Sequence, residues 1–384
     1  MGLYCAVIAC LGDAVFMAEQ EAADQSTDKP VGKSAAKPTI VTVFNQKGGV
    51  GKTTTSVNLA VCMAALGKRV VLLDLDSQSN ATTNVGVTPP ISTGAYQLLT
   101  GRAPADECLR KTDYENLRLI GGSDELAWAD IELALQPECQ GILGKALEKL
   151  PDNIDILVID CPPAPGIVSV NALVAADVVV MPVMPSPHAL DGLHKAWWNV
   201  NRVRSSYNHD LHTINIVLTM TEEGPLTQRL TEDIIAEFGP RVMPVLVPRD
   251  NVVIEAAARD LPVVSMAPQS PPARAYLRLA QLLLTRVLHM SGAPEDARLA
   301  EALEHETAAD KLAVWSAELN GRRSKLAIPE PGESPEPGWT DAPEMAQAVI
   351  GPGAGWKIGV ALGLVLLGAI LGFAAAGAYF RFPL

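Results

Sequence analysis

A glycine-rich turn between an apolar strand and a helix constrains this chain more than any other feature. Residues 40–44 are mostly β-branched and apolar, and directly after them comes the run Asn45-Gln46-Lys47-Gly48-Gly49-Val50-Gly51-Lys52-Thr53-Thr54. Helix-forming residues follow. Glycines let backbone N–H groups crowd around a phosphate, and the following helix presents its positive end there. The pattern therefore predicts a phosphate-binding loop.

The residues of this loop have separate expected tasks. Lys52 would reach the β- and γ-phosphates of ATP, and the Thr53 hydroxyl would hold Mg²⁺. The general motif has a glycine five residues before Gly51, but this chain has Gln46 there and an additional lysine, Lys47. We expect ATP and Mg²⁺ as cofactors, with the nucleotide bound by Gly48, Gly49, Val50, Gly51, Lys52, Thr53 and Thr54. A glycine-rich turn that binds nothing is the alternative, and the order of strand, loop, Lys-Thr pair and helix argues against it.

Two further apolar runs end in acids. Residues 69–73 lead to Asp74 and Asp76, and five of the six residues at 154–159, directly before Asp160, can line a buried strand. Continuous apolar runs are typical of parallel strands that are buried on both faces, and α/β folds bind ligands at the carboxyl ends of such strands. The sequence therefore predicts an α/β fold with a doubly wound, mostly parallel sheet, and it predicts acids near the phosphate loop.

The loop and the acids together resemble the deviant Walker A box and the acidic boxes of the ParA/MinD family of P-loop ATPases, and residues 45–54 are most similar to its ParA/Soj branch. The resemblance implies that Lys47, Lys52 and Asp76 are the catalytic residues. Lys47 would act on the nucleotide of a partner subunit, and Asp76 would position the attacking water. Thr53 and Asp160 would hold the metal. A carboxylate that merely caps the next helix is the alternative for Asp76.

The chain also departs from the family pattern. Ser77 and Ser79 replace a proline and a glycine in the loop after Asp76. Residues 244–256 are similar to the adenine-holding segment of the family, which implies that Pro248 and Arg249 contact the nucleotide. In that segment Asp250 is an insertion, and Val253 stands where an arginine is common.

DNA contact is left open by these residues. Arginines of the adenine segment help the DNA-binding branch of the family to grip DNA nonspecifically. Arg274, Arg278 and Arg286 could partly replace them. The formal net charge of −13 argues against a broadly basic surface, so a local arginine cluster would be needed.

The resemblance implies an ATP-dependent homodimer with slow ATP hydrolysis that a ParB-like or other protein stimulates. Its task would be to partition DNA or to position a cellular assembly. An ATP-binding scaffold without turnover is one alternative. A bacterial tyrosine kinase would need a tyrosine cluster near the carboxyl end, where only Tyr379 stands. An iron–sulfur carrier would need cysteine pairs, and the six cysteines include no Cys-x-x-Cys pair.

Composition divides the chain into five parts. Residues 1–37 are expected to be a disordered or mis-called amino-terminal extension, and 38–290 the ATPase domain. Residues 291–327 form a charged helical pattern, and 328–355 a Pro/Gly/Glu-rich linker. Residues 356–381 are predicted to be a transmembrane helix.

The membrane prediction rests on residues 358–380, which contain no charge. As a helix they would span about 34 Å, enough to cross a bilayer. A helix buried in a protein core is the alternative. We therefore predict a single-pass protein of the inner (cytoplasmic) membrane with its ATPase domain in the cytoplasm.

A pair of adjacent tryptophans predicts one exposed aromatic side chain. Trp197 and Trp198 are adjacent in a predicted helix, so they cannot share one helix face. We expect one of them in the core and the other as a candidate partner contact.

Overall fold

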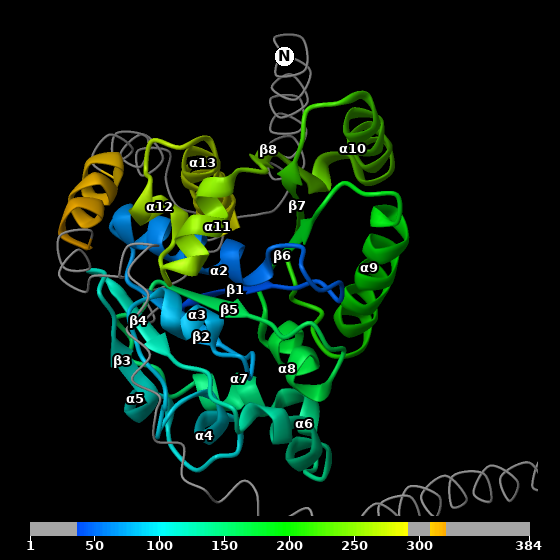
Figure 1. Ribbon diagram of the computed structural model, residues 1–384. Coiled ribbons are helices and arrows are strands. Elements are labelled where there is room, and N and C mark those ends of the chain that lie inside the picture. Colours follow the sequence, from blue (N-terminus) through cyan, green and yellow to red (C-terminus); the bar gives the residue numbers. More distant parts are fainter. Residues whose placement is uncertain (1–36, 291–307, 320–384) are drawn as a thin grey trace, which may run out of the picture. The chain divides into compact units, whose positions relative to one another are not determined.

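A computed structural model describes residues 37–290 and 308–319 of the chain (Figure 1). Its centre is one eight-stranded sheet with the order β3-β4-β2-β5-β1-β6-β7-β8, in which only β3 runs antiparallel to its neighbour. The strands are β1 (Thr39–Val43), β2 (Val70–Asp74), β3 (Leu109–Lys111), β4 (Leu117–Ile120), β5 (Ile156–Asp160), β6 (Val178–Val183), β7 (Thr213–Thr221) and β8 (Val242–Pro248). The predicted mostly parallel α/β sheet is confirmed.

Helices cover both faces of this sheet, which explains the continuous apolar strands. One face carries α2 (Lys52–Ala65), α3 (Asn80–Asn84), α11 (Asn251–Ala258), α12 (Val263–Met266) and α13 (Pro271–Met290). The other carries α4 (Ala95–Leu99), α5 (Ala105–Cys108), α6 (Leu126–Ala134), α7 (Ile142–Leu147), α8 (Ile167–Ala175), α9 (Ala189–Ser206) and α10 (Pro225–Phe238). The short 3-10 turns η1 (Cys139–Gly141) and η2 (Gly239–Arg241) complete the elements.

Strand residues alternate between the two cores. In β5, Val158 packs with the α2 side, whereas Leu157 and Ile159 pack with the α8 side. All three side chains are fully buried. Because successive side chains of a strand point to opposite faces, a single apolar run supplies both cores at once.

The register of the central strands sets the place of the site. Asp160 ends β5 and pairs in register with Asp74 of β2 on one side and with Val43 of β1 on the other. The glycine-rich loop follows β1 within a few residues and leads into α2 (Figure 1). The loop and both acids therefore meet at the carboxyl ends of neighbouring strands, as predicted.

A helix at 308–319 packs against the α2 face of the sheet. Its buried residues are Ala308, Leu312, Trp315 and Leu319, which recur at helical spacing and join the core on that side. Trp315 meets Tyr114 edge to face with ring centroids 5.4 Å apart, and the Ser316 hydroxyl donates to the Met266 carbonyl at 3.3 Å. Tyr114 is itself tied to Ser265 of α12 through their hydroxyls at 2.9 Å.

The predicted single-pass location in the inner membrane is contradicted. In the part of the chain that the structure describes, every helix is too short or too polar to span a bilayer. The longest of them, α13, contains 20 residues but carries Arg274, Arg278 and Arg286. Segment 358–380, on which the prediction rested, lies outside the described residues, as do 1–36 and the proposed linker. The five-part division of the chain stays a prediction.

Candidate nucleotide site

The glycine-rich loop is shaped by two left-handed glycines. Gly49 has φ 72° and Gly51 has φ 83°, a region that residues with a Cβ rarely adopt. Gly48 and Gly49 are exposed, and a Cβ built on either one would meet no atom within 4 Å. The backbone of the loop is thus bare on its outer side, as close approach of a phosphate requires. The α2 helix starts directly behind it at Lys52, with Thr53 and Thr54 partly buried in its first turn.

Buried polar groups hold this loop against the sheet. The Asn45 side chain donates to the Pro182 carbonyl of β6 at 2.8 Å and accepts from the Lys47 backbone N–H at 3.0 Å. The Thr219 hydroxyl of β7 donates to the Val50 carbonyl at 2.9 Å. These contacts link the loop to two strands that are distant in sequence. The roles of Asn45 and Thr219 could not be predicted from the sequence, because nothing local shows what an amide or hydroxyl will meet.

The two lysines of the loop go to different places. Lys52 is 7% exposed, and its ammonium donates to the Lys47 carbonyl at 3.2 Å. Burial lowers the pKa of Lys52, although nearby Asp160 and Asp76 oppose the shift. Lys47 is half-buried, and its ammonium donates to the Ser186 hydroxyl at 3.1 Å, in the loop between β6 and α9. Lys52 therefore lies close to the acids of its own site, whereas the Lys47 side chain contacts the loop between β6 and α9.

Asp160 is a completely buried carboxylate with one free oxygen. Its Oδ1 accepts from the Ser56 hydroxyl at 2.7 Å, while its Oδ2 has no hydrogen-bond partner among the described residues. Burial, followed by the neighbouring Asp74, raises the pKa of Asp160 to about 7. A buried oxygen without a donor fits a hard cation, since carboxylates are preferred Mg²⁺ ligands. Thr53 stands beside it, and its hydroxyl acts to lower the pKa of Asp160.

Asp74 and Asp76 have different surroundings. Asp74 is fully buried and accepts from the Thr82 backbone N–H at 2.9 Å, the Thr82 hydroxyl at 2.8 Å and the Asp76 N–H at 3.1 Å. Burial raises the pKa of Asp74 to about 6. Asp76 is half-buried, and its Oδ1 accepts from the Gln78 N–H at 3.0 Å. Asp74 thus anchors the loop that presents Asp76, a role that the sequence alone does not reveal.

The serine that replaces a family glycine keeps the glycine conformation. Ser79 has φ 54° and lies 4% exposed at the start of α3. Its N–H donates to the Asp76 carbonyl at 3.0 Å and closes the turn. The substitution therefore leaves the backbone of this loop in the left-handed turn that a glycine would adopt most easily.

The expected adenine segment lies at the end of β8. Arg249 is exposed, pairs with Glu222 at 2.7 Å and donates its N–H to the Thr221 carbonyl at 2.9 Å. Pro248 pairs in register with Thr221 of β7, the strand that also braces the glycine-rich loop. Asp250 caps α11 by accepting from the Val252 N–H at 3.0 Å, so the extra acid begins a helix. Pro248 and Arg249 share the carboxyl edge of the sheet with the loop, but among the described residues no hydrogen bond or ion pair joins their side chains to it.

Comparison with known proteins agrees with this geometry. Residues 38–213 match the AAA domain family. The chain is 38% identical over 244 residues to the sporulation initiation inhibitor protein Soj of Bacillus subtilis, a match that covers 63% of this chain and 96% of Soj. It is 36% identical over 251 residues to the chromosome partitioning protein ParA of Caulobacter vibrioides, covering 64% and 94% of the two chains.

A solved structure with a bound nucleotide has a similar fold. Cobyrinic acid a,c-diamide synthase from Mycobacterium smegmatis with bound ADP and magnesium is similar over 66% of this chain and 96% of its own, with a TM-score of 0.57 and 27% identity. The predictions of an ATPase and of ATP and Mg²⁺ as its cofactors are confirmed. With its glycine-rich loop, its buried strand-end acids and these relatives, the chain belongs to the ParA/Soj family of P-loop ATPases.

Proposed function

We propose that the chain is an ATP-dependent dimerisation switch that partitions DNA or positions a cellular assembly. ATP binding would join two copies, and slow hydrolysis, stimulated by a ParB-like or other partner protein, would separate them. The names of the relatives support the partitioning task. The observation that most supports the switch is the different surroundings of the two loop lysines. Lys52 is buried among acids, whereas the Lys47 side chain contacts a neighbouring loop.

Within one subunit the chain supplies charge and shape for the triphosphate. The N–H groups of the loop from Gly48 to Gly51 and the start of α2 favour anionic oxygens, and Lys52 adds a cation at short range. Mg²⁺ supplies neutralisation of phosphate charge when it is bound. Asp160 would hold it through Oδ2, with Thr53 beside it. Ser56 fixes Oδ1 and so aims the free oxygen.

Hydrolysis needs an oriented water, and Asp76 is the group we assign to that task. It is only half-buried, so water reaches it. The turn around it is held by Asp74, by the Gln78 N–H and by the Ser79 N–H. A fixed carboxylate can orient a water for in-line attack with little reorganisation.

Lys47 is the residue that we assign to the partner subunit. A mobile cation that enters the second site stabilises the charge that develops on the transferred phosphoryl group. In the single chain its only described polar side-chain contact is the Ser186 hydroxyl, a neutral acceptor that holds a cation weakly. Release of Lys47 toward a partner therefore costs little.

The test compares three proteins with ATP and Mg²⁺. Molar mass by light scattering and phosphate release are measured for the wild type, Lys47→Ala and Asp76→Ala. We expect Asp76→Ala to dimerise without releasing phosphate, and Lys47→Ala to bind ATP but stay monomeric. Phosphate release by the wild type and Asp76→Ala that stays at the background rate of ATP without protein would favour the alternative, an ATP-binding scaffold without turnover.

Nonspecific DNA binding is a separate proposal, which rests on the arginines of α13. Arg274 and Arg278 are exposed on α13, but Arg286 donates to the Asn215 side chain and to the Pro240 carbonyl. Val253 is partly buried against the core and offers no charge. Only two of the three arginines are thus exposed for DNA. Loss of duplex DNA binding in Arg274→Glu with Arg278→Glu would support this contact.

A further inference from the structure

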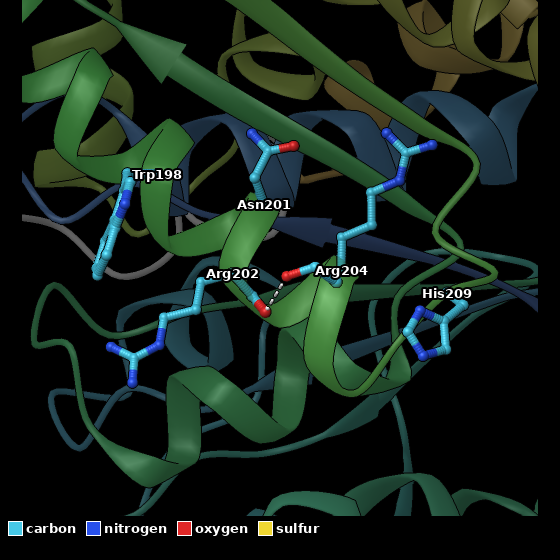
Figure 2. A pocket seen from close by; sticks show the side chains of 6 residues that line it. Trp198, Asn201, Arg202, Arg204 and His209 are labelled. Atoms are coloured by element: carbon cyan, nitrogen blue, oxygen red, sulfur yellow. Dashed lines mark hydrogen bonds between the residues drawn. The ribbon is translucent and has the colours of Figure 1, made fainter.

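The carboxyl half of α9 presents a surface that the nucleotide site does not use. Trp197 lies partly buried against Phe238 and beneath the Arg241 guanidinium, whereas Trp198 is 60% exposed. The two tryptophans thus divide between core and surface, as the sequence analysis expected of adjacent helix positions. Trp198 borders an open pocket of about 720 Å³ at the end of the helix (Figure 2).

This pocket is lined by polar and basic side chains from a short stretch of chain. Its lining residues are Trp198, Asn201, Arg202, Arg204, Ser205 and His209. We call these six residues the α9 patch. Arg202 stacks over the Trp198 ring at 5.4 Å from its centroid. Figure 2 shows Arg202 and Arg204 pointing away from each other, Arg202 on the side of Trp198 and Arg204 on the side of His209, so a ligand that lies along the helix against Trp198 would meet Arg202.

The cations of the α9 patch have no anionic partner in the described part of the chain. No carboxylate there lies within salt-bridge distance of Arg202 or Arg204. Between residues 192 and 209 the sequence contains no acid, while Lys195 adds a third cation one turn before Trp198. A basic surface on a chain of formal net charge −13 is locally opposite to the rest of the molecule. It is therefore complementary to an anion that the remainder of the chain would repel.

The length of this basic stretch limits how long a bound anionic ligand can be. Asp191 and Asp210 bound it at its two ends. The helical part between them spans about 21 Å at 1.5 Å per residue, which matches about six residues of extended peptide. Exposed tryptophan and arginine are the residue types that most often dominate protein–protein binding energy. We propose that the α9 patch binds a short acidic segment of a partner protein, with an apolar side chain of that segment seated against Trp198.

Duplex DNA fits the same surface less well. A nucleic-acid contact commonly neutralises about six to ten phosphates, whereas this stretch offers three permanent cations between two acids. The polyanion would also extend past the stretch over an acidic molecule. A short acidic peptide needs only two or three ion pairs and one apolar contact, which the patch supplies.

The test uses a fluorescent peptide of about eight residues, with glutamates on both sides of a Leu-Phe pair. Fluorescence anisotropy against the full chain should show saturable binding. We expect Trp198→Ala and Arg202→Glu each to weaken it about tenfold or more, because each removes a hot-spot contact. Arg229→Glu is the matched control, since Arg229 is also exposed, lies on α10 and undergoes the same change of charge. It should change binding by less than about twofold.

Three outcomes would overturn the proposal. One is the absence of saturable binding, and another is equal binding of a peptide in which glutamine replaces every glutamate. The third is a short DNA duplex whose binding depends on Arg202 while that of the peptide does not. Circular dichroism of each variant separates a lost contact from a lost fold, and ATP hydrolysis should stay at the wild-type rate in all three variants.

Discussion

Asn45 shows how much a single buried side chain contributes to the shape of the nucleotide site. It joins the backbone of the glycine-rich loop to β6 through one accepted and one donated hydrogen bond. We expect Asn45→Ala to lower ATP affinity about tenfold, because the loop must then be ordered by the ligand itself. Isothermal titration would measure the change. Gln46→Ala is the control at the adjacent, partly exposed position, and equal losses in the two variants would refute the bracing role.

The raised pKa values of Asp160 and Asp74 have a consequence for stability. Their folded values of about 7 and about 6 lie above the ordinary value of a carboxyl group, so the folded chain binds more protons than the unfolded chain between about pH 4 and 7. Without nucleotide or Mg²⁺, the free energy of unfolding should fall as pH rises through that window. Urea unfolding at a series of pH values would measure it.

The matching variant for this effect is Asp160→Asn. It keeps an acceptor for Ser56 and removes the buried charge. We expect the free energy of unfolding to be higher than that of the wild type by about 1–3 kcal/mol at neutral to alkaline pH, with a smaller difference in acid. Stabilisation by Mg²⁺ with ATP should be lost in the same variant. A variant that unfolded more easily than the wild type at every pH would contradict the argument.

At the scale of elements, the sequence predicted the three neighbouring strands that carry the site and missed the edge strand β3. The apolar runs that became β1, β2 and β5 could be recognised because helices bury these strands on both faces. The strand β3 has only three residues, Leu109–Lys111, and none is buried, so no pattern marked it. The loop and Asp160 could be predicted from local order, whereas Ser56 and Asn45 act through partners that only the folded chain brings close.

The 308–319 helix is the element whose packing the sequence did not predict. Its charged composition indicated a helix, but the apolar stripe that meets Tyr114 depends on a partner far away in the chain. We expect Trp315→Ala to lower the free energy of unfolding by about 3 kcal/mol, since the ring is 8% exposed. Val314→Ala on the same helix, where the side chain is 55% exposed, should cost less than about 0.5 kcal/mol. Similar losses of stability at both positions would show that Trp315 does not pack into the core.

At the scale of the whole molecule, the negative net charge of each copy works against dimerisation. Two copies of formal charge −13 repel at a distance, and salt screens that repulsion. The proposed ATP-dependent dimer should therefore tighten as ionic strength rises from about 50 to about 300 mM. Sedimentation of Asp76→Ala with ATP would measure the association constant. Dimerisation that weakened with salt would instead indicate an interface dominated by opposite charges.

The Ser56 hydroxyl has a consequence for the proposed nucleotide-dependent switch. It contacts both the Lys52 carbonyl at the start of α2 and the Asp160 carboxylate at the end of β5. Helix start and strand end are thereby fastened together, so the proposed switch would not pass on the loss of a phosphate by a separation of α2 from β5. The signal would travel instead through the long side chain of Lys47, whose one described polar side-chain contact is the neutral Ser186 hydroxyl.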